Sequence, residues 1–165
     1  MLTKKIEKIL NEQIIKEGYS SNLYLSMASW ADKEGYAGIA QWLFAQAEEE
    51  RTHMMKFINF INERGGHAII PAFDVPPSSF PGIKELFNEV LAHEQYITGS
   101  INDIVALTIE EKDFATNNWV QWFVTEQVEE EASVQIVIDK LNMLGDKNMY
   151  MFDRDIMGLR GTSEE

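Results

Sequence analysis

The feature of this sequence that most constrains its fold is a helical spacing of apolar residues that recurs in four long segments. In the first segment, Leu10 and Ala31 fall on one seven-residue spacing, with Ile14 and Met27 beside it. Such a stripe is typical of a long amphipathic helix that buries one face. The four stripes predict helices over about residues 3–33, 38–64, 81–111 and 113–144.

The segments between these helices predict how the helices are connected. Residues 35–38 make a short turn, so the first two helices should form an antiparallel hairpin. The second helix stops at Gly65 and Gly66, and all four prolines lie between there and Gly82. About 17 residues at about 3.3 Å each can span more than 50 Å, enough to run back along a helix of about 40 Å. We therefore predict a long crossover that places the third helix parallel to the second.

These elements predict an all-α fold, with a four-helix bundle over residues 1–145 and a short C-terminal helix and tail over residues 146–165. The length of 165 residues and the mass of 18.9 kDa fit a single domain over residues 1–165 with a core of its own. Apolar residues in the tail predict that the fifth helix packs on another subunit. They are Tyr150, Phe152, Ile156 and Leu159. Residues 161–165 are expected to fray.

The composition excludes several classes of protein. The chain has no Cys, which excludes a disulfide scaffold, an iron–sulfur cluster and a Cys-type zinc site. No apolar run has the length of a signal peptide or of a membrane span of about 20 residues, so we expect a cytoplasmic protein without a membrane partner. The net charge of −13 argues against nucleic acid and favours cations, although many proteins are acidic simply to stay dispersed.

Six polar residues interrupt the apolar stripes, each near the middle of its helix. They are Glu17, Glu50, His53, Glu94, Gln127 and Glu130. Glu50 and His53 are three residues apart and project from one face of a helix, and Gln127 and Glu130 repeat this spacing. A single such carboxylate is more often a boundary residue with its head in water, because burying it without a partner costs several kcal/mol. Six polar residues at the same height in a bundle indicate a site more strongly than one does, because their side chains would converge on one layer.

A layer of this composition predicts bound metal. Carboxylates a few ångströms apart would force most of one another to protonate, whereas a pair of divalent metal ions would neutralise them and use their lone pairs. Hard oxygen ligands with one nitrogen suit iron or manganese better than copper or a closed zinc site. Carboxylates stabilise the ferric form, so we expect a dinuclear site in which iron cycles between Fe(II) and Fe(III).

The acidic residues beside this layer have two interpretations. Glu49, Glu126 and Glu129 each lie one residue from a central residue, and Glu126 reaches Glu129 and Glu130 at helical spacings. They could form a third cation site on the side that faces away from the bundle axis. They could equally be a solvated acidic face.

Several aromatic residues and histidines lie near the predicted layer. Tyr24 could be a core residue whose hydroxyl bonds Glu50, a metal ligand or an electron donor. We interpret Trp122 as packing, and we expect His67 and His93 to be exposed.

The same residues give the chain a resemblance to a known family. The matching pieces are Asn11-Glu12-Gln13 with Glu17, Ala47-Glu48-Glu49-Glu50 with His53, His93-Glu94, and Glu126-Gln127-Val128-Glu129-Glu130-Glu131. Along nearly its whole length the chain resembles the non-haem ferritins of bacteria and archaea. The resemblance implies a ferritin-like four-helix bundle.

The resemblance also implies a role for each site residue. A first iron ion would be held by Glu17, Glu50 and His53. A second would be bridged by Glu50 and held by Glu94 and Glu130, with Gln127 beside it. The family's third iron site is matched by Glu49, Glu126, Glu129 and Glu130, and its conserved tyrosine by Tyr24.

The function implied by the resemblance is iron storage and detoxification. The protein would act as a ferroxidase on ferrous iron and dioxygen, and a homo-oligomeric shell of twenty-four subunits would hold the Fe(III) mineral. The rival hypotheses are a diiron oxygenase that acts on an organic substrate and a bundle without a redox role.

The sequence departs from related families in two motifs. Arg51 stands where bacterioferritin has its haem-ligating Met, so no haem is expected. Gln127-x-x-Glu130 stands where bacterioferritins and diiron oxygenases have Glu-x-x-His. The second iron ion should therefore be held more loosely, which suits a site that passes iron on.

Overall fold

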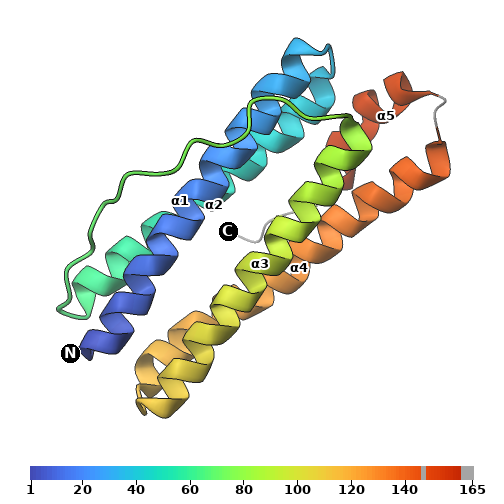
Figure 1. Ribbon diagram of the computed structural model, residues 1–165. Coiled ribbons are helices and arrows are strands. Elements are labelled where there is room, and N and C mark those ends of the chain that lie inside the picture. Colours follow the sequence, from blue (N-terminus) through green and yellow to red (C-terminus); the bar gives the residue numbers. More distant parts are fainter. Residues whose placement is uncertain (146–147, 161–165) are drawn as a thin grey trace.

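The computed structural model describes residues 1–145 and 148–160, and it is built of helices joined by loops (Figure 1). The long helices are α1 (Lys4–Lys33), α2 (Ala37–Glu63), α3 (Ile83–Glu110) and α4 (Phe114–Leu144). Two short elements follow, α5 (Met149–Asp155) and the 3-10 turn η1 (Ile156–Leu159). The described residues include no strand, so the predicted all-α class is confirmed. The predicted fraying of residues 161–165 lies outside the described residues.

Side chains at the helix ends help to fix where the helices begin. The hydroxyl of Thr3 accepts a hydrogen bond from the backbone N–H of Ile6 and caps α1. The carboxylate of Asp113 accepts one from the N–H of Thr116 and caps α4. Such caps satisfy N–H groups that have no partner inside the helix. None of the helices among the described residues is both long and apolar enough to cross a membrane.

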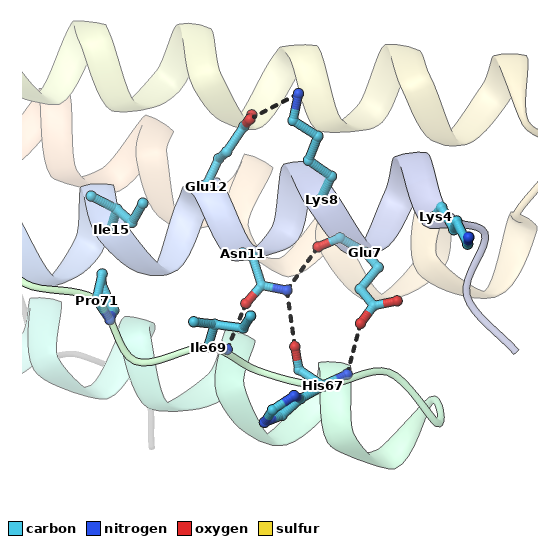
Figure 2. Close-up of a pocket in the computed structure, with 9 residues that line it drawn as sticks. All are labelled: Lys4, Glu7, Lys8, Asn11, Glu12, Ile15, His67, Ile69 and Pro71. Carbon is cyan, nitrogen blue, oxygen red and sulfur yellow. Dashed lines mark hydrogen bonds and ion pairs between the residues drawn. The ribbon is translucent and has the colours of Figure 1, made fainter.

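The crossover between α2 and α3 runs along α1, so α2 and α3 point the same way, as predicted (Figure 1). Two side chains of α1 hold the first part of the crossover (Figure 2). Glu7 accepts a hydrogen bond from the backbone N–H of His67 at 2.8 Å, and Asn11 accepts one from the backbone N–H of Ile69 at 2.7 Å. Further along, the ring of Phe73 lies over Gly18, where a Cβ atom would stand 2.2 Å from the ring. This close approach explains why a glycine interrupts α1, and nothing in the sequence around Gly18 indicated it.

The core consists of two apolar clusters with a polar layer between them. One cluster fills the end of the bundle that holds Leu43 of α2 and Val134 of α4, and the other fills the end that holds Phe57 and Phe123. Between them in each long helix lie the buried polar residues that interrupt the apolar stripes. The apolar clusters therefore supply the packing energy, and the polar layer is surrounded by protein on both sides.

The fifth helix packs on its own chain through Phe152 and Ile156, which was not expected from the sequence, and its contact with another subunit stays a prediction. α5 and η1 contact α2 and α4 (Figure 1). Phe152 and Ile156 are buried in the apolar cluster at that end of the bundle. Asp153 accepts a hydrogen bond from the N–H of Ile39 at 2.9 Å, and its backbone passes so close to Gly38 that a Cβ there would clash. Of the four apolar residues named from the sequence, Phe152 and Ile156 are buried, Leu159 is partly buried and Tyr150 is exposed, and the pattern did not indicate which elements they would contact.

Candidate metal centre

The six residues that interrupt the stripes are all buried, as the spacing predicted. Their exposed fractions lie between 0% and 5% for Glu17, Glu50, His53, Glu94, Gln127 and Glu130. Each of the four long helices contributes at least one of them, and each contributes it between the two apolar clusters. Burial and convergence are thus properties of the fold, and the metal-binding roles stay predictions.

Glu17 of α1 meets Glu50 and His53 of α2 at the centre of this layer. His53 Nδ1 lies 3.5 Å from Glu50 Oε2 and 4.0 Å from Glu17 Oε2. One potential ligand atom from each of the three residues falls within 4.8 Å of the others. Both oxygens of Glu50 and Oε2 of Glu17 are buried and accept no hydrogen bond.

These unpaired oxygens fit a metal ion. A buried carboxylate oxygen without a partner loses its hydration and gains nothing in return, at a cost of about 1–3 kcal/mol or more. Two atoms that each lie about 2.1 Å from one transition-metal ion are separated by about 3–4 Å. The spacing of His53 Nδ1 from the two carboxylates falls in this range. A divalent cation between them would satisfy all three oxygens.

The electrostatics of the layer disfavour the charged form of its carboxyl groups. Burial, and next the charge of Glu50, raise the pKa of Glu17 to about 8. Burial raises the pKa of Glu94 to about 7, although hydrogen bonds from Tyr24 and Gln127 act in the opposite direction. Burial, together with the neighbouring charge of Glu94, also raises the pKa of Glu50 and of Glu130. Burial thus favours the protonated form of all four carboxyl groups.

The second half of the layer is tied together by hydrogen bonds. Tyr24 donates its hydroxyl proton to Glu94 Oε1, which corrects the alternative in which this hydroxyl bonds Glu50. Gln127 Nε2 donates to Glu94 Oε2 at 3.1 Å and to the backbone carbonyl of Glu94 at 3.2 Å. Glu130 Oε2 accepts from Nε2 of Gln46 at 2.6 Å. Each carboxylate on this side therefore has a fixed neutral partner.

Sequence reasoning missed a buried chain of hydrogen bonds that leads to Glu17. Lys16 Nζ donates to Ser100 Oγ, whose hydroxyl donates to Oε1 of Gln13, both at 2.5 Å. Gln13 Nε2 in turn donates to Glu17 Oε1 at 2.8 Å. Gln13 and Gln46 both lie on apolar stripes, Gln13 four residues before Glu17 and Gln46 seven before His53. That spacing was the signal that could have identified them.

His93 is half-buried, which corrects the expectation that it is exposed. Its Nε2 lies 2.7 Å from Ser20 Oγ, and its ring packs edge-on against Tyr24 with 5.9 Å between centroids. Burial lowers the pKa of His93 to about 4, so the imidazole is neutral at pH 7. His67 is exposed, as expected. Trp122 packs edge-on against the ring of His53, with 5.5 Å between centroids.

The outer acidic residues do not form one group. Glu126 has ligand atoms within 4.8 Å of both His53 and Glu130. Glu49 is paired with Arg160, and Glu129 is exposed. Neither of these two belongs to a group of potential metal ligands among the described residues. A third site built from Glu49, Glu126 and Glu129 together therefore stays a prediction.

Comparisons with known proteins agree with one another. The family model described as the ferritin-like domain matches residues 7–144. A probable bacterial non-heme ferritin-like protein of Haemophilus influenzae is 42% identical over 161 residues, which cover 96% of this chain and 98% of that protein. A bacterial non-heme ferritin of Campylobacter jejuni is 40% identical, with 96% of both chains covered. The solved structure of an open-pore ferritin from the archaeon Archaeoglobus fulgidus superposes with a TM-score of 0.93 at 40% identity, over 97% of this chain and 98% of that chain.

Proposed function

The chain belongs to the ferritin family, and from this membership we propose that it oxidises ferrous iron with dioxygen at a dinuclear centre and stores the ferric product as a mineral. The observation that carries the proposal is a layer in which each of the four long helices buries a carboxylate. Three of these carboxylate oxygens accept no hydrogen bond. A structural core would place apolar residues there. An iron-storage function without oxidation would not need a site for two ions in this dry interior.

In the proposed centre, the resemblance to the family assigns a role to each residue. Glu17, Glu50 and His53 bind the first ferrous ion. Glu50 bridges to a second ion, which Glu94 and Glu130 hold. The carboxyl groups that hold a proton near pH 7 release it when an ion takes its place, so binding is coupled to proton release.

The protein then positions the two ions and leaves the electron transfer to the metal. Each ferrous ion gives up one electron, so a pair supplies two electrons to dioxygen. Tyr24 fixes the Glu94 carboxylate through its hydroxyl, and the role of its phenol as an electron donor is part of the proposal. Gln127 gives Glu94 a neutral amide and adds no charge or imidazole at the second ion, which favours release of ferric iron.

The finer features of the cofactor and the location also stay proposals. We propose that no haem is bound, because Arg51 stands where the bacterioferritins have a ligating Met. The outer acidic residues Glu49, Glu126 and Glu129 would serve a third iron ion together with Glu130. The cytoplasmic location and the absence of nucleic acid as a partner follow from the sequence expectations alone.

The proposed assembly is a hollow shell of twenty-four copies. The crossover exposes large apolar side chains, among them Ile69, Ile70 and Val75, which suit contacts between copies of the chain. Twenty-four chains of 18.9 kDa would give a particle of roughly 450 kDa in size-exclusion chromatography. A dimer would favour the oxygenase hypothesis.

The experiment that tests the oxidation is aerobic addition of ferrous iron while ferric absorbance is recorded. We expect the protein to oxidise iron much faster than buffer does. Glu50→Ala should lower the initial rate by at least about a hundredfold, because Glu50 would contact both ions. Glu48→Ala is the matched control, since Glu48 is an exposed neighbour on the same helix. Equal rates in Glu50→Ala and Glu48→Ala would remove the ferroxidase claim.

A further inference from the structure

The end of the described chain brings a cation to the edge of the metal centre. Arg160 directly follows η1 and donates from Nη2 to the Glu49 carboxylate. Its Nη1 donates to Oε1 of Gln46 and to the backbone carbonyl of Trp42, both at 3.2 Å. The guanidinium thus has three acceptors, all of them on α2.

This ion pair is better shielded than most others among the residues that the structure describes. The side chains of Arg160 and Glu49 are 17% and 19% exposed. The pair between Arg154 and Asp155 is 53% and 60% exposed and spans adjacent residues of one segment. Exposed pairs contribute little because water and salt screen them, whereas a shielded pair with several hydrogen bonds holds its geometry.

The segment that carries Arg160 is fixed to the bundle. Ile156 of η1 is fully buried, and Asp153 of α5 bonds the N-terminus of α2. Arg160 is therefore delivered to Glu49 by packed structure.

Arg160 is also linked to the inner carboxylates. Gln46 accepts from Arg160 through Oε1 and donates to Glu130 through Nε2, the latter at 2.6 Å. Glu130 belongs with His53 and Glu126 to the second group of potential metal ligands. Two of these three residues, His53 and Glu130, are more than nine-tenths buried. The guanidinium thus lies one amide away from this group and in direct contact with Glu49.

We propose that Arg160 is a built-in counter-ion that holds Glu49 away from the group of His53, Glu126 and Glu130, so that an ion at this outer group can gain Glu49 as a further ligand only by displacing the guanidinium. A carboxylate that accepts charge-assisted hydrogen bonds from Arg loses ligand strength for a second cation. Once Arg160 leaves, Glu49 and Gln46 are both free to turn towards Glu130. The C-terminal segment would thereby set how tightly a third ion is held. The inference rests on the proposed function, because it assumes that the layer beside it binds iron.

Competition at one carboxylate has a reciprocal consequence. If the guanidinium weakens the binding of a third ion, that ion must weaken the attachment of Arg160 by the same factor. An ion at the outer group should therefore loosen residues 149–160 from α2.

The binding experiment uses the assembled protein, titrated calorimetrically with Co(II) without oxygen. We expect two tight ions per chain in every variant, together with a weaker third. Arg160→Gln should tighten the third ion by about tenfold, within the usual range of coupling between sites. Arg160→Lys should stay near the original affinity, because it keeps the charge. In a background of Glu49→Gln, Arg160→Gln should give no gain.

Each outcome of this titration has a distinct meaning. Two tight ions with a third ion unchanged by Arg160→Gln would overturn this inference and leave the proposed function standing. A gain that persists with Glu49→Gln would also overturn it, because the effect would not pass through Glu49. Failure of the original chain to bind ions tightly in the layer would instead refute the proposed function, and the inference with it.

Amide hydrogen exchange gives a second readout that does not depend on catalysis. In the original chain, exchange within residues 149–160 should accelerate when Co(II) is raised from two to three ions per chain. Glu49→Gln should abolish that acceleration. Unchanged protection of this segment at saturating Co(II), with a third ion bound, would contradict displacement of Arg160.

Discussion

The inner layer and the outer acidic group use the same side chain in opposite ways. Glu50 is buried with both oxygens unpaired, and its neighbours are other carboxylates. Glu49, the preceding residue of α2, is partly exposed and paired with Arg160. Among the described residues, the unpaired oxygens of Glu50 have no guanidinium beside them, whereas Glu49 has that of Arg160. In the proposed centre, an ion would therefore fill an empty place inside and would compete with Arg160 outside.

This difference indicates how one helix can serve two kinds of site. Consecutive helical residues point about 100° apart, so Glu50 lies in the buried layer while Glu49 points towards Arg160, the residue that follows η1. Burial without partners favours tight ion binding, because each ion relieves an existing cost. Pairing with Arg favours weak and adjustable binding.

The largest contrast should appear in stabilisation by metal. At a free concentration one hundred times its dissociation constant, each bound ion adds about 2.7 kcal/mol to the free energy of unfolding. Glu50→Gln should remove most of this gain in stability, since Glu50 would bind both inner ions. Glu126→Gln should leave the gain unchanged. Denaturant unfolding with and without Co(II) measures both. Equal losses in the two variants would remove the distinction between inner and outer sites.

The next largest effect should be the pH dependence of the metal-free protein. The pKa of Glu17, about 8, and that of Glu94, about 7, exceed the ordinary value of 4.5. The folded chain thus binds more protons than the unfolded chain, so this contribution to stability is complete below pH 4.5 and is lost as pH rises towards 8. The loss should be on the order of a few kcal/mol.

Variants of α1 connect that pH dependence to the inner layer. Glu17→Gln should flatten the fall in urea midpoint between pH 5 and pH 8, measured with a chelator present. Glu12→Gln is the control, because Glu12 is exposed on the same helix. If the urea midpoint rises with pH in this range, or if Glu17→Gln leaves its slope against pH unchanged, the inner carboxyl groups do not cause the pH dependence of stability.

A smaller effect is expected from the hydrogen-bond chain behind Glu17. Gln13→Leu removes the N–H donor that fixes Glu17, and loss of such a partner typically weakens metal binding by 10–100-fold. We expect about tenfold for the tighter ion in a Co(II) titration. Ser100→Ala, one link further out, should cost less. An equal or greater loss from Ser100→Ala would show that Gln13 is not the positioning residue.

The smallest effects should come from the outer acids. Glu126→Gln should weaken a third ion and change the initial rate of iron oxidation by less than about twofold, because Glu126 is partly exposed. Glu129→Gln should have still less effect on the third ion, since Glu129 is exposed and belongs to neither group of ligand atoms. Calorimetry on both variants ranks them, and a loss of the inner ions in either one would contradict the separation of the two sites.

The helices and the depth of the polar layer could be predicted because both follow from periodicity. A carboxylate at a core position of a helical stripe, such as Glu17 or Glu94, can be recognised from the sequence alone. The residue that its side chain contacts cannot be recognised in this way. Tyr24 lies on the correct stripe, but only the packing of α1 on α3 determined that its hydroxyl bonds Glu94. For the same reason, His93 was expected to be exposed, although Ser20 and three neighbouring tyrosines partly cover it.

The sequence by itself determined the helical segments, the long crossover and the set of polar residues that share one buried layer, because helical spacing fixes which side chains lie on which face. The tertiary structure decided what those faces meet: Phe73 against Gly18, α5 against its own bundle, and Arg160 on Glu49. Contacts between residues this far apart in the chain leave no periodic signal. They depend on where the connecting segments return, which only the folded chain defines.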